Sequence, residues 1–258
     1  MTEEDLSVEI TRDGHVAVVS FARPPHNFAD LELIGGIGAA FEAADADAAV
    51  RAIVLRSEGK VFCAGADLAN ASPVAGEPAA GERNPFYVAA ARLFRVRKPV
   101  VAAVQGAAVG AGLGLALVAD FRVASPSARF VANFVQLGFH PGFGISAVLE
   151  RVVGRQRAAL MLMTGRRIGG EQAVEWGLAD VLADDADAAA LTLAREIATG
   201  APLAVQSTRA TIRGDLHALV ERQTDHELTE QQWLQKTADY AEGVRAVNER
   251  RPGRFVGA

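Results

Sequence analysis

Two glycine-rich turns decide the fold of this chain: FCAGADL at residues 62–68 and GAAVGAGLG at residues 106–114. Each turn follows a short apolar run that is typical of a buried β-strand, and the second leads into a run typical of a helix. The first N–H groups of a helix have no partner within the helix and carry a partial positive charge. Small side chains would let a ligand oxygen approach such groups. Two turns of this kind facing each other could hold one carbonyl oxygen between two backbone N–H groups, as an oxyanion hole does.

Close packing of a strand against a helix also explains the glycines of either turn taken singly, so the argument rests on the pair. Phosphate-binding loops fit poorly. The chain has no GxxxxGK[ST] motif, and its glycines at 110, 112 and 114 lack the GxGxxG spacing. The two turns therefore favour a carbonyl over a phosphate as their ligand.

Strand-like and helix-like runs alternate on both sides of the turns. Asp13-Gly14 lies between two apolar runs and predicts a β-hairpin. Residues 69–85, rich in proline, glycine and small side chains, are expected to form a mobile loop or lid. Further strands are expected at 50–56, 100–104, 121–124 and 129–135, and helices at 30–44, 86–95, 110–117, 146–153, 155–164 and 170–176. This alternation predicts an α/β fold whose strands are buried on both faces.

The pattern changes after residue 184, where no further strand is expected. Helices are predicted at 186–199, 202–212, 217–234 and 237–250. Residues 201–258 carry eight Lys or Arg and eight Asp or Glu, so the net charge of −5 lies in residues 1–200. We therefore expect an α/β core over residues 1–200 and a separate helical unit over residues 201–258.

The composition is that of a globular protein with a substantial core. Half of the 258 residues are hydrophobic and 22% are charged. The net charge of −5 lacks the basic footprint of nucleic-acid binding. The single cysteine, Cys63, cannot form an intrachain disulfide, which favours a reducing compartment. No spacing of His, Cys, Asp or Glu suggests a metal site.

One apolar stretch, residues 100–119, is nearly long enough to span a membrane. Gln105 and Gly106 interrupt it, so it is interpreted as a buried strand, a turn and a buried helix. The first residues are acidic and have no apolar segment of the kind found in a secretory signal. No membrane span is expected, and a cytoplasmic location fits best.

The two turns together are specific, and the chain resembles the crotonase superfamily, the enoyl-CoA hydratase/isomerase family, over essentially its whole length. The resemblance implies a spiral of ββα repeats with an all-helical C-terminal trimerisation region, giving a homotrimer or a dimer of trimers. It also implies fatty acid metabolism, lyase or isomerase chemistry and an acyl-CoA thioester as ligand. Coenzyme A would then be part of the substrate, with no tightly bound cofactor.

By this resemblance, the thioester oxygen would lie between the backbone N–H groups of Ala66 and Ala111. Many members have glycine where Ala111 stands, but only its N–H group matters. The same resemblance implies that the coenzyme A channel is lined by His26, Phe28, Ala64, Asp67 and Leu68.

The acid–base half of the site differs from the pattern of the family's hydratases, which activate a water with two glutamates. The matching positions here are Gly114 and Phe134, and residues 111–117 and 129–140 contain no carboxylate. Neither side chain can move a proton, so efficient hydration is not expected.

His140 is the best alternative base, because it follows the second lost glutamate and imidazole titrates near neutral pH. A hydrogen bond to a loop carbonyl, or capping of the following helix, would explain His140 equally well. Tyr87 and Arg92 could also reach the acyl group. An apolar substrate pocket is expected from Val109, Leu113, Gly114, Phe134 and Phe139, with packing in the core as the alternative.

Three functions remain open. The first is an enzyme that acts on acyl-CoA thioesters through the two-amide hole. The second is a non-catalytic acyl-CoA-binding protein. The third is a structural role in a larger fatty-acid or polyketide assembly, with residues 201–258 as the interface. The intact glycine turns argue against the third, and the missing glutamates favour the second over ordinary hydration.

Overall fold

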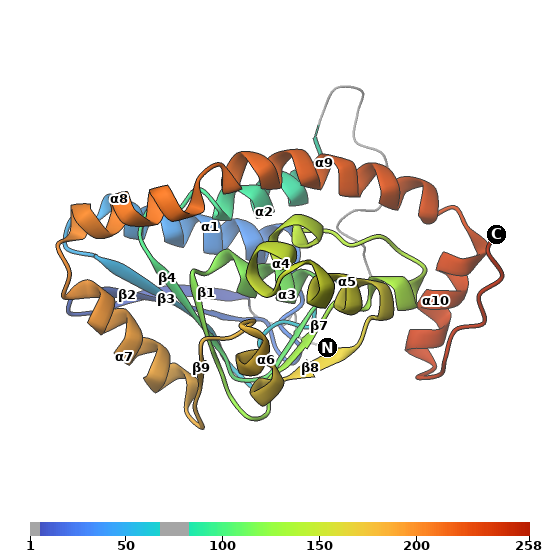
Figure 1. The fold of residues 1–258 in the computed structure, drawn as a ribbon, viewed down its shortest axis with the longest axis horizontal. Coiled ribbons are helices and arrows are strands. Elements are labelled where there is room, and N and C mark those ends of the chain that lie inside the picture. The colour runs from blue at the N-terminus through green and yellow to red at the C-terminus, as the bar shows by residue number, and fades with distance from the viewer. Residues whose placement is uncertain (1–5, 68–82) are drawn as a thin grey trace.

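The computed structural model describes residues 6–67 and 83–258 and contains two sheets (Figure 1). The larger sheet has the order β1-β2-β3-β4-β6-β9, in which only the β1–β2 hairpin is antiparallel. The smaller sheet has the order β5-β7-β8, with β8 antiparallel to β7. The strands are β1 Ser7–Asp13, β2 Val16–Ala22, β3 Ala52–Ser57, β4 Val100–Val104, β5 Ala107–Val109, β6 Phe121–Ala124, β7 Arg129–Val131, β8 Arg167–Gly169 and β9 Val181–Leu182.

Helices cover both faces of the larger sheet. In Figure 1, α8 and α9 run along one side, above α1 and α2, and α7 lies on the opposite face of the sheet. The helices are α1 Leu31–Ala46, α2 Pro85–Leu93, α3 Ala111–Val118, α4 Ile145–Val153, α5 Arg155–Thr164, α6 Gly170–Trp176, α7 Ala186–Ala198, α8 Pro202–Arg213, α9 Leu216–Leu234 and α10 Ala238–Asn248, with a 3₁₀ helix, η1, at Asn133–Leu137.

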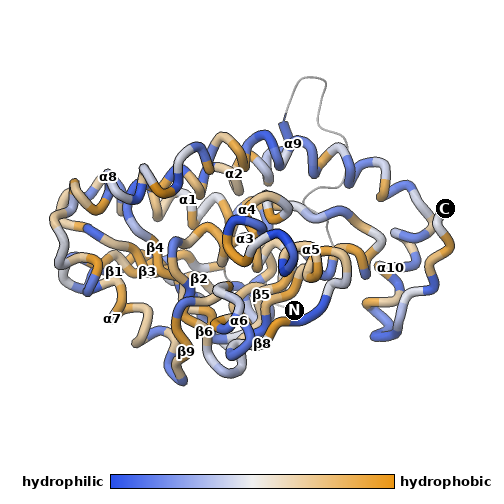
Figure 2. Tube along the Cα trace, in the orientation of Figure 1, coloured by the Kyte–Doolittle hydropathy of each residue, from blue (hydrophilic) through white to orange (hydrophobic). Residues whose placement is uncertain are grey.

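Strand β4 shows why the sheet is buried on both sides. Val100, Ala102 and Val104 face the large core that includes α1, α2 and α3. Val101 and Ala103 face a second core, against a row of alanines on α7. Successive side chains of a strand point to opposite faces, so a continuous apolar run fills both cores. Figure 2 accordingly shows hydrophobic colour along the central strands.

The α/β architecture and the hairpin predicted from the sequence are confirmed. Residues 100–119 form the expected strand β4 and helix α3, but the segment between them contains a further short strand, β5, where only a turn was expected. No helix of the described residues combines the length and apolar character needed to cross a membrane. The loop predicted for residues 69–85 lies mostly outside the described residues. Its last residues are described, and Asn84 caps the start of α2 by accepting from Phe86 N at 2.9 Å.

One strand prediction was wrong. Residues 129–135 were expected to form a single strand, but the strand ends at Val131 and η1 follows from Asn133. The backbone leaves the extended conformation at Ala132, and Gly138 ends η1 in the left-handed conformation. A short apolar run is compatible with strand or helix, so the pattern alone could not locate this break.

Helix α10 packs tightly on η1 through two glycines. A Cβ atom on Gly138 would lie 2.7 Å from the carbonyl oxygen of Asp239, and a Cβ on Gly243 would overlap the Leu137 backbone. Glycine at both positions therefore lets the backbones of α10 and η1 lie in direct contact. The helical tail also joins the main core, through Leu216, Val220 and Leu228 of α9.

Candidate active site

The two glycine turns lie side by side in the structure. Cys63 forms a parallel bridge with Ala108, in which Cys63 N donates to Ala107 O and Val109 N to Cys63 O, both at 3.0 Å. Gly112 lies so close that a Cβ atom there would overlap the Cys63 carbonyl oxygen. Backbone pairing and a missing side chain therefore bring the turns into contact, as expected from the sequence.

Gly65 brings the first turn against the second. Its φ of +87° is rarely adopted by other residues, and a Cβ atom would lie 2.6 Å from the Val109 carbonyl oxygen. The turn is held from its other side by Ala64 N donating to His26 O at 3.0 Å and Ala29 N donating to Gly65 O at 2.8 Å. The position of Ala66, the next residue, is thereby restricted from both sides.

The N–H groups of Ala66 and Ala111 have no hydrogen-bond acceptor among the described residues. Ala111 is the first residue of α3, where a helical N–H group has no partner within the helix. Both residues line one cavity of about 240 Å³. Two residues with an unpaired backbone donor, one from each turn, therefore line the same cavity.

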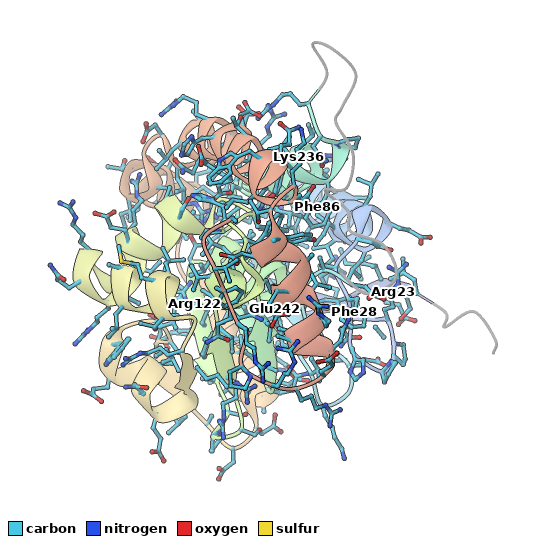
Figure 3. All side chains as sticks on the ribbon, turned by 90° about the vertical axis from the view of Figure 1, so that its right-hand side faces the viewer. Arg23, Phe28, Phe86, Arg122, Lys236 and Glu242 are labelled. Carbon is cyan, nitrogen blue, oxygen red and sulfur yellow. The ribbon has the colours of Figure 1, made fainter. Side chains whose placement is uncertain are left out.

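The remaining wall of the cavity is largely aromatic. Figure 3 looks onto α10, with Phe28 and Phe86 labelled beside it. No lysine, arginine or histidine is among the described lining residues, and Asp67 is the only carboxylate among them. The lining residues are Phe28, Ala64, Gly65, Ala66, Asp67, Phe86, Tyr87, Val109, Gly110, Ala111, Asn133, Phe134, Leu137, Phe139, Gly142, Phe143, Gln231, Val244, Val247 and Asn248.

Most of the predicted site residues meet at this cavity: Phe28, Ala64, Ala66, Asp67, Val109, Ala111, Phe134 and Phe139. His26 does not line it, although its carbonyl holds the first turn. Leu68 lies outside the described residues. Leu113 was expected in the pocket, but its side chain is fully buried in the core, because it lies on a face of α3 turned away from the cavity.

Gly114 also lies outside the cavity lining, because the ring of Phe143 covers it. A Cβ atom on Gly114 would lie 2.6 Å from Cδ1 of Phe143. Phe143 itself lines the cavity. An aromatic ring thus fills the space into which a side chain at position 114 would project.

The structure does not place His140 at the cavity. Its Nδ1 lies 2.8 Å from the Pro141 carbonyl oxygen, and its ring packs edge-on against His226, whose side chain is exposed. The loop turns the imidazole outward while its backbone carbonyl accepts from Gln231 at 2.9 Å. This is the alternative considered from the sequence, a hydrogen bond to a loop carbonyl, and it places the ring away from Ala66 and Ala111.

The other reactive side chains are engaged in the fold. Cys63 is fully buried, and desolvation raises the pKa of its thiol to about 12, so it stays protonated and unreactive. Asp120 accepts from Arg209 and Arg213 at 2.8 and 2.7 Å and ties α8 to the core. Within residues 6–67 and 83–258, no three His, Cys, Asp or Glu side chains are grouped to hold a metal ion.

Sequence reasoning missed the contribution of the C-terminal helices to the cavity. Gln231 comes from α9, and Val244, Val247 and Asn248 come from α10. The α10 residues share one helix face because they are three and four positions apart. That spacing was visible in the sequence, but nothing local indicated which surface it would cover.

A family model described as enoyl-CoA hydratase/isomerase matches residues 11–258. The chain belongs to the enoyl-CoA hydratase/isomerase family, in the crotonase superfamily. Among curated family members, it is 41% identical over 207 residues to a protein of Mycobacterium tuberculosis named probable enoyl-CoA hydratase, covering 80% of this chain and 81% of the relative. It is 37% identical over 220 residues to the 1,2-epoxyphenylacetyl-CoA isomerase of Escherichia coli, covering 82% and 83%.

The fold is also that of the family. A crystal structure of an enoyl-CoA hydratase/isomerase from Pseudoalteromonas atlantica superposes with a TM-score of 0.85 at 28% identity. The match covers 97% of this chain and all of the other. The crotonase-like fold with a helical C-terminal region, expected from the sequence, is therefore confirmed.

Proposed function

We propose that the protein binds acyl-CoA thioesters, with the thioester oxygen between the N–H groups of Ala66 and Ala111. The observation that carries the proposal is that both N–H groups lack an acceptor among the described residues and meet at one cavity. Removal of a proton beside a thioester builds an enolate, whose charge collects on that oxygen. Two fixed donors stabilise this charge, and loss of one such donor costs about 3 kcal/mol in other enzymes.

The cavity wall supports an uncharged acyl group with an apolar or aromatic body. Phe28, Phe86 and Phe134 supply apolar surface. No described lining residue carries a positive charge that could pair with a free carboxylate on the acyl group. The name of the Escherichia coli relative, an isomerase of an epoxidised phenylacetyl thioester, agrees with an aryl acyl group. Malonyl-type thioesters, which bear an anion, fit this wall poorly.

We propose further that efficient hydration is not the reaction. The two positions that match the glutamates of the family's hydratases hold Gly114 and Phe134, and Phe143 fills the space beside Gly114. Asp67, next to Ala66, is the only carboxylate among the described lining residues, so in a catalytic protein we assign proton transfer to Asp67. The scarcity of acid–base groups favours a second candidate, a non-catalytic protein that binds and holds acyl-CoA.

Cytoplasmic location and a role in fatty acid metabolism belong to the same proposal. Their support is the single buried cysteine, which fits a reducing compartment, and membership of the family.

The test measures binding and turnover on one sample. Calorimetry with 3-phenylpropanoyl-CoA, a saturated ligand that cannot be hydrated, is expected to show binding. Crotonyl-CoA is expected to keep its conjugated thioester absorbance, because the described lining residues offer no pair of carboxylates to activate water. Failure to bind any acyl-CoA would refute the proposal. Hydration at ordinary enzymatic rates would refute its second part and show that another group activates water.

A further inference from the structure

Two buried polar side chains, Tyr87 of α2 and Gln231 of α9, meet at the wall of the cavity, which the polar residues Asp67, Asn133 and Asn248 also line. Tyr87 is 4% exposed and Gln231 is 1% exposed. Tyr87 Oη lies 2.6 Å from Gln231 Oε1. Gly142 lies beside both, since a Cβ atom there would overlap Tyr87 Oη and lie 2.7 Å from Gln231 Nε2. All three residues line the cavity, and the hydroxyl end of Tyr87 lies between the other two.

Two backbone carbonyls determine which way the Gln231 amide faces. Gln231 Nε2 lies 2.9 Å from His140 O and 3.3 Å from Pro141 O. Carbonyl oxygens only accept hydrogen bonds, so the group that faces them must be the NH₂ of the amide. The Oε1 atom therefore faces Tyr87.

The direction of the Tyr87 proton follows from this arrangement. Gln231 Oε1 is an acceptor only, so Tyr87 donates its hydroxyl proton to it. Burial is the main cause that raises the pKa of Tyr87 well above its usual value, with the nearby Glu227 carboxylate adding to it, so the phenol stays neutral. No described residue donates a hydrogen bond to Tyr87 Oη. Its oxygen can thus accept a hydrogen bond, but its proton is already engaged.

We propose that Tyr87 is a specificity-determining residue that selects acyl groups bearing a hydroxyl donor, with a hydroxyaryl or hydroxyacyl thioester as the favoured ligand class. This inference rests on the proposed function, because it places the acyl group in the cavity. The Tyr87 oxygen accepts a hydrogen bond from the acyl hydroxyl. An acyl group that carries only a hydrogen-bond acceptor near Tyr87 gains no affinity, because the donor protons of Tyr87 and Gln231 are already bound to other acceptors.

The experiment compares saturated aryl ligands that differ at one ring position. Calorimetry measures the affinity of 3-phenylpropanoyl-CoA and of its 2-, 3- and 4-hydroxyphenyl analogues. One hydroxy isomer is expected to bind about fivefold more tightly than the parent, the usual worth of one neutral hydrogen bond. The fluoro analogue at the same ring position is close in size but cannot donate, and it is expected to bind like the parent.

Tyr87→Phe removes the oxygen and keeps the ring. It is expected to abolish the fivefold preference, measured as the ratio of the variant's affinities for the hydroxy isomer and the parent. Tyr240→Phe is the matched control, because Tyr240, the second tyrosine of the chain, packs on Phe139 and does not line the cavity. This control should keep the preference.

The possible failures are distinguishable. If the parent binds and no hydroxy isomer binds more tightly, or if the fluoro analogue gains equally, the inference is wrong and the proposed function stands. A preference that survives in Tyr87→Phe also overturns the inference. If no acyl-CoA binds, the proposed function fails and this inference fails with it. The affinities of the hydroxy and fluoro ligands are compared on the wild-type protein alone, so this comparison tests the inference even if the variant does not fold.

Discussion

Gly114 and Phe143 are in such close contact that neither can change size independently of the other. Phe143 has a φ of +66°, a left-handed conformation that is uncommon for a bulky residue, and its Cβ would lie 2.8 Å from a Cβ on Gly114. Its ring also packs against Phe86, with 5.8 Å between ring centroids. A side chain at position 114 therefore requires a change at position 143.

We predict strong coupling between these two residues. Gly114→Ala should lower the free energy of unfolding by about 1–3 kcal/mol, because its methyl group overlaps Phe143. In a Phe143→Gly background the same substitution should cost much less, since glycine removes the side chain and suits the left-handed φ. Urea unfolding of the four proteins measures the coupling. If the changes in the free energy of unfolding are strictly additive, the two residues do not interact and the prediction is wrong.

Some contacts of individual site residues could be predicted from the sequence, and others could not. Gly65 and Gly112 lie in local motifs that identified the two turns, and the family resemblance then indicated which N–H groups of these turns would be the donors. Gln231 is 144 positions from Tyr87, and only the path of α9 across α2 brings them together. His140 had a plausible position in sequence, but the direction of its ring depends on the loop's packing against α9. Contacts made within a motif were predictable, whereas contacts made between distant helices were not.

Helices α4 and α9 are joined by a buried carboxylate. Glu227 of α9 is fully buried and accepts hydrogen bonds from Gly144 N at 2.7 Å and from Ser146 N and Oγ at 3.1 and 2.5 Å. No described cation pairs with it. Burial raises its pKa to about 7, although the hydrogen bonds from Ser146 and Gly144 act in the opposite direction.

We predict that this carboxylate makes the protein less stable as pH rises from about 4.5 to about 7. The folded pKa lies above the usual value of 4.5, so the folded state binds the proton more tightly and loses that advantage as the pH passes through the folded pKa. The contribution is on the order of 3 kcal/mol. Glu227→Gln should flatten this part of the stability curve, measured by urea unfolding at pH 5 and pH 8. An unchanged difference between the two pH values would show that Glu227 does not titrate there.

In the whole molecule, the C-terminal helices both line the cavity and expose apolar side chains to solvent. Residues on α9 and α10 close the cavity, although the sequence pattern assigned 201–258 to a separate unit. Helix α8 has no fully buried residue, and Leu203 and Ile212 on it are 79% and 76% exposed. These two side chains are nine positions apart and point to opposite sides of α8, so the expectation that they contact other subunits comes from the family resemblance.

We predict that the protein is a trimer or a dimer of trimers. Sedimentation should give three or six times the chain mass of 27.1 kDa. Leu203→Asp combined with Ile212→Asp should shift the mass toward that of one chain, because each aspartate would place a charge in the interface. Leu182→Asp is a matched control, since Leu182 is an exposed apolar residue on β9. A wild-type protein that sediments as a single chain would contradict the prediction.

The central claim is that two backbone N–H groups polarise one thioester carbonyl. The most direct measurement is the infrared stretch of 3-phenylpropanoyl-CoA labelled with ¹³C at the thioester carbonyl and bound to the protein. The wild type and Ala111→Gly, which keeps the N–H group, should shift this stretch to lower wavenumber. Ala111→Pro removes the N–H group at the first helical position, where proline is tolerated, and should lose most of the shift. An unshifted band in the wild-type complex, or the same shift in Ala111→Pro, would contradict the account.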